Sequence, residues 1–261
     1  MRIPYFQVNA FTTESFGGNP AGVCPLQSWP ADGLLQRIAA ENDLSETAFF
    51  CEQNGSIQLR WFTPTVEVDL CGHATLATAF VLFREMGRPV AELRFETRSG
   101  QLKAAWRDGK VELDFPSWPP VACDEWDSLG RALGRRPTEV LRSRDYLAVF
   151  DTEADVEALS PDIELLRALE CHAVIATARG REVDFVSRFF APRAGIPEDP
   201  VTGSAHCTLI PFWAERLGRK ELLAKQISRR GGKLFCRDAG ERVLIAGEAM
   251  VYCRGELEIA E

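Results

Sequence analysis

The chain has 261 residues, of which 46% are hydrophobic and 26% charged, with a formal net charge of −8. This composition excludes disordered and fibrous proteins, and the length allows one large domain or two smaller ones. The acidic balance disfavours nucleic acid and anionic membranes as partners. No apolar stretch approaches the roughly 18 residues of a membrane span, and the N-terminus lacks a signal-peptide core, so we expect a cytoplasmic protein.

The cysteines and histidines argue against a metal or disulfide framework. Eight cysteines are scattered singly, which favours reduced thiols. Three histidines are present, and the CxxC, HxxxH and HExxH spacings are absent, so no dedicated metal site is expected. Nucleotide-binding glycine motifs are absent too. We predict that the protein works without metal or cofactor, through its own side chains.

The first part of the chain alternates strand and helix signals. Apolar spacing and turn residues predict a strand over 3–11, a glycine-rich turn over 16–22, a short strand at Val23, a surface helix over 31–41, and strands over 45–50 and 56–62 around a turn at 53–55.

Two stretches of the chain resemble each other. In the first, an aromatic strand end at 61–64 leads into a loop and a nearly all-apolar helix within 69–87; in the second, 188–192 leads into 198–218 in the same way. A helix that is apolar all round must be buried on every side. We therefore predict an α/β fold of two pseudo-symmetric domains, each a β-sheet or barrel wrapped around a central helix.

The domain boundary is expected in the proline-rich segment 115–120, which cannot continue a central strand. We place the N-terminal half at 1–117 and the C-terminal half at 118–249, and the last strand, about 250–261, is a candidate to return to the first half. The remaining elements of the second half are expected helices at 125–133 and 162–169 and strands at 145–150, 173–177, 183–190, 234–237, 242–246 and 248–258.

The starts of the two apolar helices are candidate anion sites. Unpaired backbone N–H groups and a partial positive charge gather at a helix N-terminus, and Gly72 and Gly203 would let the backbone approach a carboxylate. If the repeated halves face each other, both loops aim at one ligand in a cleft. The alternative is that both loops simply cap core helices.

Four side chains near these loops are candidates for chemistry, and three of them have a plainer alternative. Asp199 lies before a proline in the second loop, where its pKa can be perturbed, or it is a solvated loop acid. His73 begins the first helix, where the dipole favours a neutral imidazole and a base, or it only caps the helix. Cys71 should be acidified beside a helix N-terminus. Glu46 precedes a strand, and taken alone its carboxylate is expected to point to water.

Five blocks of the sequence, in order, resemble the phenazine-biosynthesis PhzF-like family. They are Gly17-Gly18-Asn19-Pro20-Ala21-Gly22-Val23, Leu44-Ser45-Glu46-Thr47-Ala48-Phe49, Phe62-Thr63-Pro64, Cys71-Gly72-His73-Ala74-Thr75-Leu76 and Glu198-Asp199-Pro200-Val201-Thr202-Gly203-Ser204-Ala205-His206. The resemblance runs from about residue 5 to the last strand. It implies the diaminopimelate-epimerase-like fold, usually as a homodimer.

The resemblance also implies an activity and roles for individual residues. The family's characterised reaction isomerises trans-2,3-dihydro-3-hydroxyanthranilate without a cofactor, and a glutamate shuttles the proton. Carried over, Glu46 becomes the proton carrier, which reverses the expectation from its local sequence, and His73 and Asp199 assist. The substrate-binding groups implied are Gly72, Gly203, Ser204, Asn19 and Cys71.

Two other functions stay open beside this isomerase. Related epimerases and racemases resemble users of two thiols, and here only Cys71 is present, because the second loop carries Pro200 and no cysteine. One alternative is therefore a Cys71-dependent epimerase or racemase. The other is a non-catalytic metabolite-binding protein of the same fold. All three would take a small carboxylate-bearing molecule.

Overall fold

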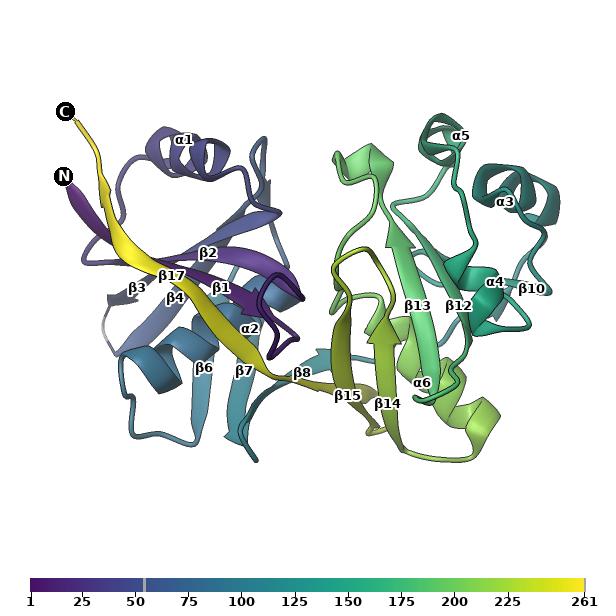
Figure 1. Ribbon diagram of the computed structural model, residues 1–261. Helices are drawn as coiled ribbons and strands as arrows, with labels where there is room; N and C mark the ends of the chain where they lie inside the picture. The colour runs from purple at the N-terminus through teal and green to yellow at the C-terminus, as the bar shows by residue number, and fades with distance from the viewer. Residues whose placement is uncertain (54, 261) are drawn as a thin grey trace. The chain divides into compact units, whose positions relative to one another are not determined.

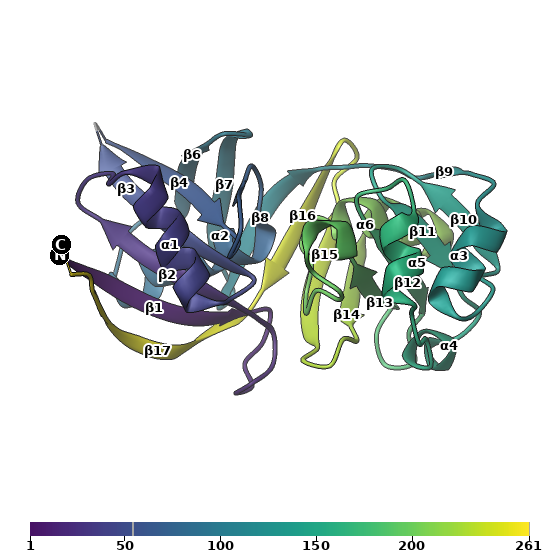
Figure 2. The ribbon, with the colours of Figure 1, turned by 90° about the horizontal axis from the view of Figure 1, so that it is seen from above.

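The computed structural model describes residues 1–53 and 55–260, and it divides into two compact units (Figures 1 and 2). The first comprises Met1–Asp114 together with Ala246–Glu261, and the second comprises Phe115–Ile245. The sequence predicts the boundary within the proline-rich segment 115–120, and in the structure the chain passes to the second unit between Asp114 and Phe115. The predicted turn at 53–55 includes Asn54, which lies outside the described residues.

The first unit contains most of the strands of the chain's first half and its last strand. Its elements are β1 (Arg2–Ala10), β2 (Asn19–Leu26), α1 (Asp32–Asn42), β3 (Glu46–Gln53), β4 (Ser56–Phe62), β5 (Glu67–Val68), α2 (Gly72–Phe80) with a π-helical turn (Val81–Glu85), β6 (Glu92–Thr97), β7 (Gly100–Arg107), β8 (Lys110–Pro116) and β17 (Ala249–Glu258).

The second unit is built in the same manner, with more helix on its outside. Its elements are β9 (Val121–Ala122), α3 (Trp126–Leu133), β10 (Glu139–Arg142), β11 (Tyr146–Val149), α4 (Glu153–Glu157), α5 (Ile163–Ala168), β12 (Val174–Arg179), β13 (Phe185–Phe190), a 3₁₀ turn (Pro192–Ala194), α6 (His206–Leu217), β14 (Glu221–Gln226), β15 (Gly232–Asp238) and β16 (Arg242–Gly247).

Strand pairing repeats between the units. In the first, β1–β2 is antiparallel, β2–β3 parallel, β3–β4 antiparallel, β4–β6 parallel and β6–β7 antiparallel. In the second, β10–β11, β11–β12, β12–β13, β13–β14 and β14–β15 follow the same alternation. The central helix follows β5 in one unit and β13 in the other. This repeat confirms the predicted α/β fold of two pseudo-symmetric domains.

The last strand lies beside the first. β17 pairs antiparallel with β1 along its length, from Arg2 opposite Glu258 to Ala10 opposite Ala249, and both strands can be followed side by side in Figures 1 and 2. The amino group of Met1 donates a hydrogen bond to the Ile259 carbonyl at 2.7 Å. The two ends of the described chain are therefore held together in the first unit.

Each unit encloses one apolar helix. In α2 the residues from Gly72 to Ala79 are all buried, and the helix contacts β1, β2, β3, β7 and β17. In α6, eight of the twelve residues are buried, and the helix contacts β14 and β15. The apolar sequence of both helices thus fits their position, because no face of α2 is left for polar side chains.

A proline inside α6 is accommodated by the segment that links the units. Pro211 has no backbone N–H, so the carbonyl of Cys207, four residues earlier, lacks its helical partner. The Trp118 N–H donates to that carbonyl at 2.9 Å. The proline-rich segment is thereby attached to the central helix of the second unit.

Smaller helices cover the outer faces of the strands. Leu35 and Ile38 of α1 pack with Phe49 and Phe62 in the first unit. In the second, α3, α4 and α5 pack over β12 and β13. Among the described residues, no helix combines the length and apolar character needed to cross a bilayer.

Candidate active site

The first unit gathers four of the predicted site residues at the N-terminal end of α2. Glu46 begins β3, His73 is the second residue of α2, Cys71 precedes the helix and Asn19 begins β2; all four are buried. His73 Nε2 lies 3.1 Å from Glu46 Oε2. On the other side of the ring, Nδ1 lies 3.1 Å from Asn19 Nδ2 and 3.5 Å from Cys71 Sγ. The imidazole therefore sits between a carboxylate and an amide–thiol pair.

Glu46 and His73 face each other without forming a good hydrogen bond. Their facing atoms are at ion-pair distance, yet within the described chain neither Glu46 Oε2 nor His73 Nε2 makes a well-aligned hydrogen bond to a protein group. Buried polar atoms are nearly always hydrogen-bonded, and an exception calls for an explanation. Two such atoms 3.1 Å apart are suited to a ligand that bonds to both.

The charge of His73 differs from the sequence expectation. The helix dipole predicted a neutral imidazole, and burial also lowers the pKa, but negative charge at Cys71 and at Glu46 outweighs burial and raises the pKa well above 6.5. At neutral pH we assign the effect to Glu46, since the Cys71 thiol is then protonated. The expectation of a neutral imidazole was wrong because a carboxylate at 3.1 Å acts more strongly on the ring than the end of a helix.

Asn19 can serve both charge states of the ring. With its amide nitrogen toward Nδ1, it donates to a neutral imidazole that carries its proton on Nε2. Rotating the amide by 180° presents the oxygen, which accepts from an imidazolium; the two orientations are assigned from the hydrogen-bond network. Asn19 is thus a partner that His73 keeps when its proton moves.

Cys71 is not the acidified thiol that its sequence position predicted. Burial, followed by the charge of Glu46, raises its pKa to about 11, although His73 and a backbone hydrogen bond act in the opposite direction. Burial thus outweighs the helix N-terminus, and Cys71 is a neutral thiol at physiological pH.

Glu46, Cys71 and His73 are also of the residue types that bind metal ions. Among the described residues, ligand atoms of Glu46, Cys71 and His73 lie within 4.8 Å of one another. However, Glu46 faces Nε2 of the ring and Cys71 faces Nδ1. Because the carboxylate and the thiol approach different nitrogens of the same ring, this arrangement suits proton transfer along the ring.

The second unit holds the other predicted residues in the loop before α6. Asp199 is buried, and its Oδ2 accepts from the Thr202 hydroxyl at 2.5 Å. Gly203 is buried and Ser204 half-buried. Gly72 is the first residue of α2 as expected, but Gly203 lies in a tight turn before α6, because the N–H groups of residues 206–208 bond to carbonyls only three residues back.

Two further residues of this loop region were given no role from the sequence. Gln226, at the end of β14, is fully buried, and its amide bonds to Asp199 and Thr202. His206 Nδ1 donates to the Thr202 carbonyl at 2.8 Å, and burial lowers the pKa of His206 to about 4, so it is a neutral structural group.

An arginine–glutamate pair holds the loop before each central helix. Arg60 bonds Glu67 with two nitrogens at 2.7 Å, and its guanidinium lies over Phe62. Arg188 bonds Glu198 in the same way, at 2.7 and 2.9 Å, and lies over Phe190. Both loops are therefore held by the same two-nitrogen arginine–glutamate ion pair.

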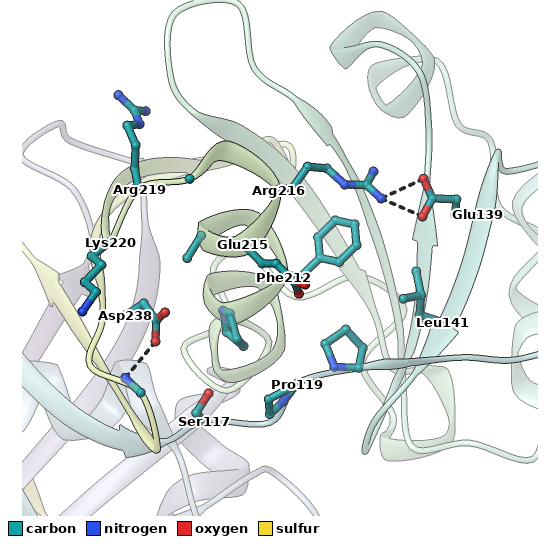
Figure 3. A pocket seen from close by; sticks show the side chains of 15 residues that line it. Ser117, Pro119, Glu139, Leu141, Phe212, Glu215, Arg216, Arg219, Lys220 and Asp238 are labelled. Carbon is teal, nitrogen blue, oxygen red and sulfur yellow. Dashed lines mark hydrogen bonds and ion pairs between the residues drawn. The ribbon is translucent and has the colours of Figure 1, made fainter.

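A different pocket lies in the second unit. It has a volume of about 730 Å³ and is bordered by the linking segment, β10 and the C-terminal end of α6 (Figure 3). Arg216 faces Glu139 there, at 2.7 and 2.8 Å, and lies over the Phe212 ring. None of the predicted site residues is among the residues that line it, and two of its charged groups neutralise each other, so we do not assign it to the reaction.

Comparison with known proteins identifies the family of the chain. The model of the phenazine biosynthesis-like protein family matches residues 8–255. The chain belongs to this PhzF family. Two uncharacterized isomerases of Pseudomonas aeruginosa are 51% and 49% identical to it, over 99% and 100% of this chain and all of each relative. Its relatives' names agree with the predicted enzyme class, isomerase.

Solved structures confirm the PhzF fold. A PhzF-family protein of Enterococcus faecalis is 45% identical, covers 99% of this chain and 100% of its own, and has a TM-score of 0.97. A predicted epimerase of Pseudomonas aeruginosa, 18% identical with a TM-score of 0.78 and similar coverage, shares the fold alone.

Proposed function

We propose that this PhzF-family protein is a cofactor-independent isomerase that moves a proton on a small carboxylate-bearing substrate, with Glu46 as the proton carrier. The observation that carries the proposal is the buried Glu46–His73 pair, whose facing atoms lie 3.1 Å apart and lack well-aligned protein partners among the described residues. A carboxylate that removes and returns a proton works best when its pKa is tuned toward the operating pH, and burial and a neighbouring titratable group are the means of tuning it.

The other residues would divide the work as follows. His73 stabilises the Glu46 carboxylate and, with Asn19 behind it, adjusts its own protonation as the proton leaves and returns. Asp199 supplies a second buried carboxyl group in the loop before α6. In the first unit, backbone N–H groups at Gly72 would bind the substrate's carboxylate. Gly203 and the Ser204 hydroxyl are the corresponding groups of the loop before α6 in the second unit.

A screen for deuterium uptake tests this function. The enzyme in D2O is incubated with trans-2,3-dihydro-3-hydroxyanthranilate and with small cyclic and amino carboxylates, and NMR detects exchange at carbon. The proposal expects uptake into at least one class of compound, and exchange that persists in Cys71→Ala at saturating compound, whatever the change in binding. Loss of exchange in Cys71→Ala would instead support the racemase, and binding of a compound without exchange in any of them would support a binding protein.

A further inference from the structure

Gln226 forms a group of buried hydrogen bonds that the proposed function does not use. Polar side chains with no exposed surface are unusual in a strand that faces a core, yet Gln226 ends β14 with no exposed surface. Its amide oxygen accepts from the Thr202 N–H at 2.9 Å, and its nitrogen donates to the Asp199 carbonyl at 2.7 Å and to the Thr202 hydroxyl at 3.2 Å. All these bonds go to one loop.

The hydrogen bond from Gln226 to the Thr202 hydroxyl determines which way that hydroxyl donates. Because Gln226 Nε2 donates to Thr202 Oγ1, that hydroxyl is an acceptor on one side and points its hydrogen elsewhere. It donates this hydrogen to Asp199 Oδ2 at 2.5 Å. These two hydrogen bonds run from the Gln226 amide to the Thr202 hydroxyl and from that hydroxyl to the Asp199 carboxylate. They therefore orient the Asp199 carboxyl group and favour its ionised form, since a hydrogen bond donated to a carboxylate stabilises the charge.

We infer that Gln226 is a positioning residue, which acts through the Thr202 hydroxyl to hold the Asp199 carboxylate in one orientation and in its ionised form. The relevance to catalysis rests on the proposed function, in which Asp199 belongs to the active site. The orientation of the Asp199 carboxylate does not depend on the proposed function.

The same turn of the chain supplies a matched control. Ser228, two residues beyond Gln226, donates its hydroxyl hydrogen to the Pro200 carbonyl at 2.7 Å. Ser228→Ala removes an anchor of the same loop but leaves the Gln226–Thr202–Asp199 chain intact. It separates a general loosening of the loop from the loss of this particular chain.

The test is an NMR pH titration of the Asp199 carboxyl carbon, assigned with Asp199→Asn, which requires no turnover. Gln226→Leu and Thr202→Val should raise the midpoint by about one to two pH units, as expected for a lost hydrogen bond to a charged group of about 1.5–3 kcal/mol. Thr202→Ser, which keeps the hydroxyl, and Ser228→Ala should leave it within about 0.3. Gln226→Glu, which keeps the shape but loses the donors, should raise it at least as much as Gln226→Leu.

An unchanged midpoint in Gln226→Leu and Thr202→Val, with a lowered melting temperature, would overturn the inference and leave Gln226 as a packing residue. If Gln226→Leu fails to fold, the contrast between Thr202→Val and Thr202→Ser decides in its place. Because the titration is independent of substrate, a negative deuterium screen would count against the proposed function without touching this result.

Discussion

The Glu46→Gln substitution should convert His73 from a charged to a neutral imidazole at pH 7. In the structure the two groups face each other at 3.1 Å, and at an effective dielectric constant of about 20 a charge pair at this distance attracts by roughly 5 kcal/mol. Burial of the imidazolium opposes this by several kcal/mol. The variant keeps the burial and removes the attraction, so the balance reverses.

Imidazole ¹⁵N NMR can read this change directly, because the chain has three histidines. His206 serves as an internal reference, since its pKa of about 4 keeps it neutral throughout, and His172→Gln completes the assignment. We expect both nitrogens of His73 to be protonated at pH 7 in the wild type and one in Glu46→Gln. A neutral His73 in the wild type, or a charged one in the variant, would show that Glu46 does not set the charge of the imidazole.

Four further outcomes follow from other parts of the structure. The wild type should lose stability relative to Glu46→Gln as pH rises. The raised pKa of His73 adds to the free energy of unfolding fully below pH 6.5, and this contribution is lost as the pH rises through the pKa of the folded state. Urea unfolding at several pH values checks this, and a difference between the two proteins that does not depend on pH would contradict it. Cys71, buried and with its pKa raised to about 11, should react with iodoacetamide at pH 7.5 much more slowly than exposed Cys253, and equal rates by mass spectrometry would count against a neutral buried thiol. Arg188→Lys should cost about 1–3 kcal/mol in urea unfolding because it breaks the two-nitrogen bond to Glu198, and a cost below about 0.3 would show that the pair adds nothing. Gly247→Ala should cost about 1–3 kcal/mol, since its Cβ would lie within van der Waals radii of Phe11, whereas Gly255→Ala, with open space around it, should be neutral or stabilising; equal effects would argue that Phe11 moves aside.

Much of the fold was predictable because its strongest signals are repeated. The apolar helices that became α2 and α6 are recognisable by being apolar on all sides, and the aromatic strand ends before them mark the repeat. The strands β6 to β8 were missed. β7 carries Lys103, Ala104 and Ala105, which favour helix as much as strand, and its pairing with β6 and β8 decides its conformation.

Position in the sheet explains why the site was harder to predict. Glu46 starts β3, a strand buried on both faces, so the alternation that normally tells an inward residue from an outward one is absent; the family resemblance, and not the local pattern, pointed to it. Gln226 was missed for the opposite reason. In β14 the buried positions are Leu222, Ala224 and Gln226. Because the third buried position holds a polar residue, the alternation of apolar and polar residues does not reveal the strand.

The charges of the site were beyond the sequence because they depend on contacts between distant residues. His73 and Cys71 were assigned from the helix end beside them, which predicts a neutral ring and an acidic thiol. The structure brings Glu46 to within 3.1 Å of the ring and buries the thiol, and these two facts reverse both expectations.

The role of Glu46 as proton carrier is tested most directly by the rate of solvent deuterium exchange into the compound that the screen identifies, in wild type and in Glu46→Gln. With Gln at this position the shape is kept and the carboxylate is lost. If Glu46 carries the proton, the exchange rate should fall about 10²- to 10⁴-fold in the folded variant, with binding of the compound retained. Exchange within tenfold of the wild type would show that another group moves the proton.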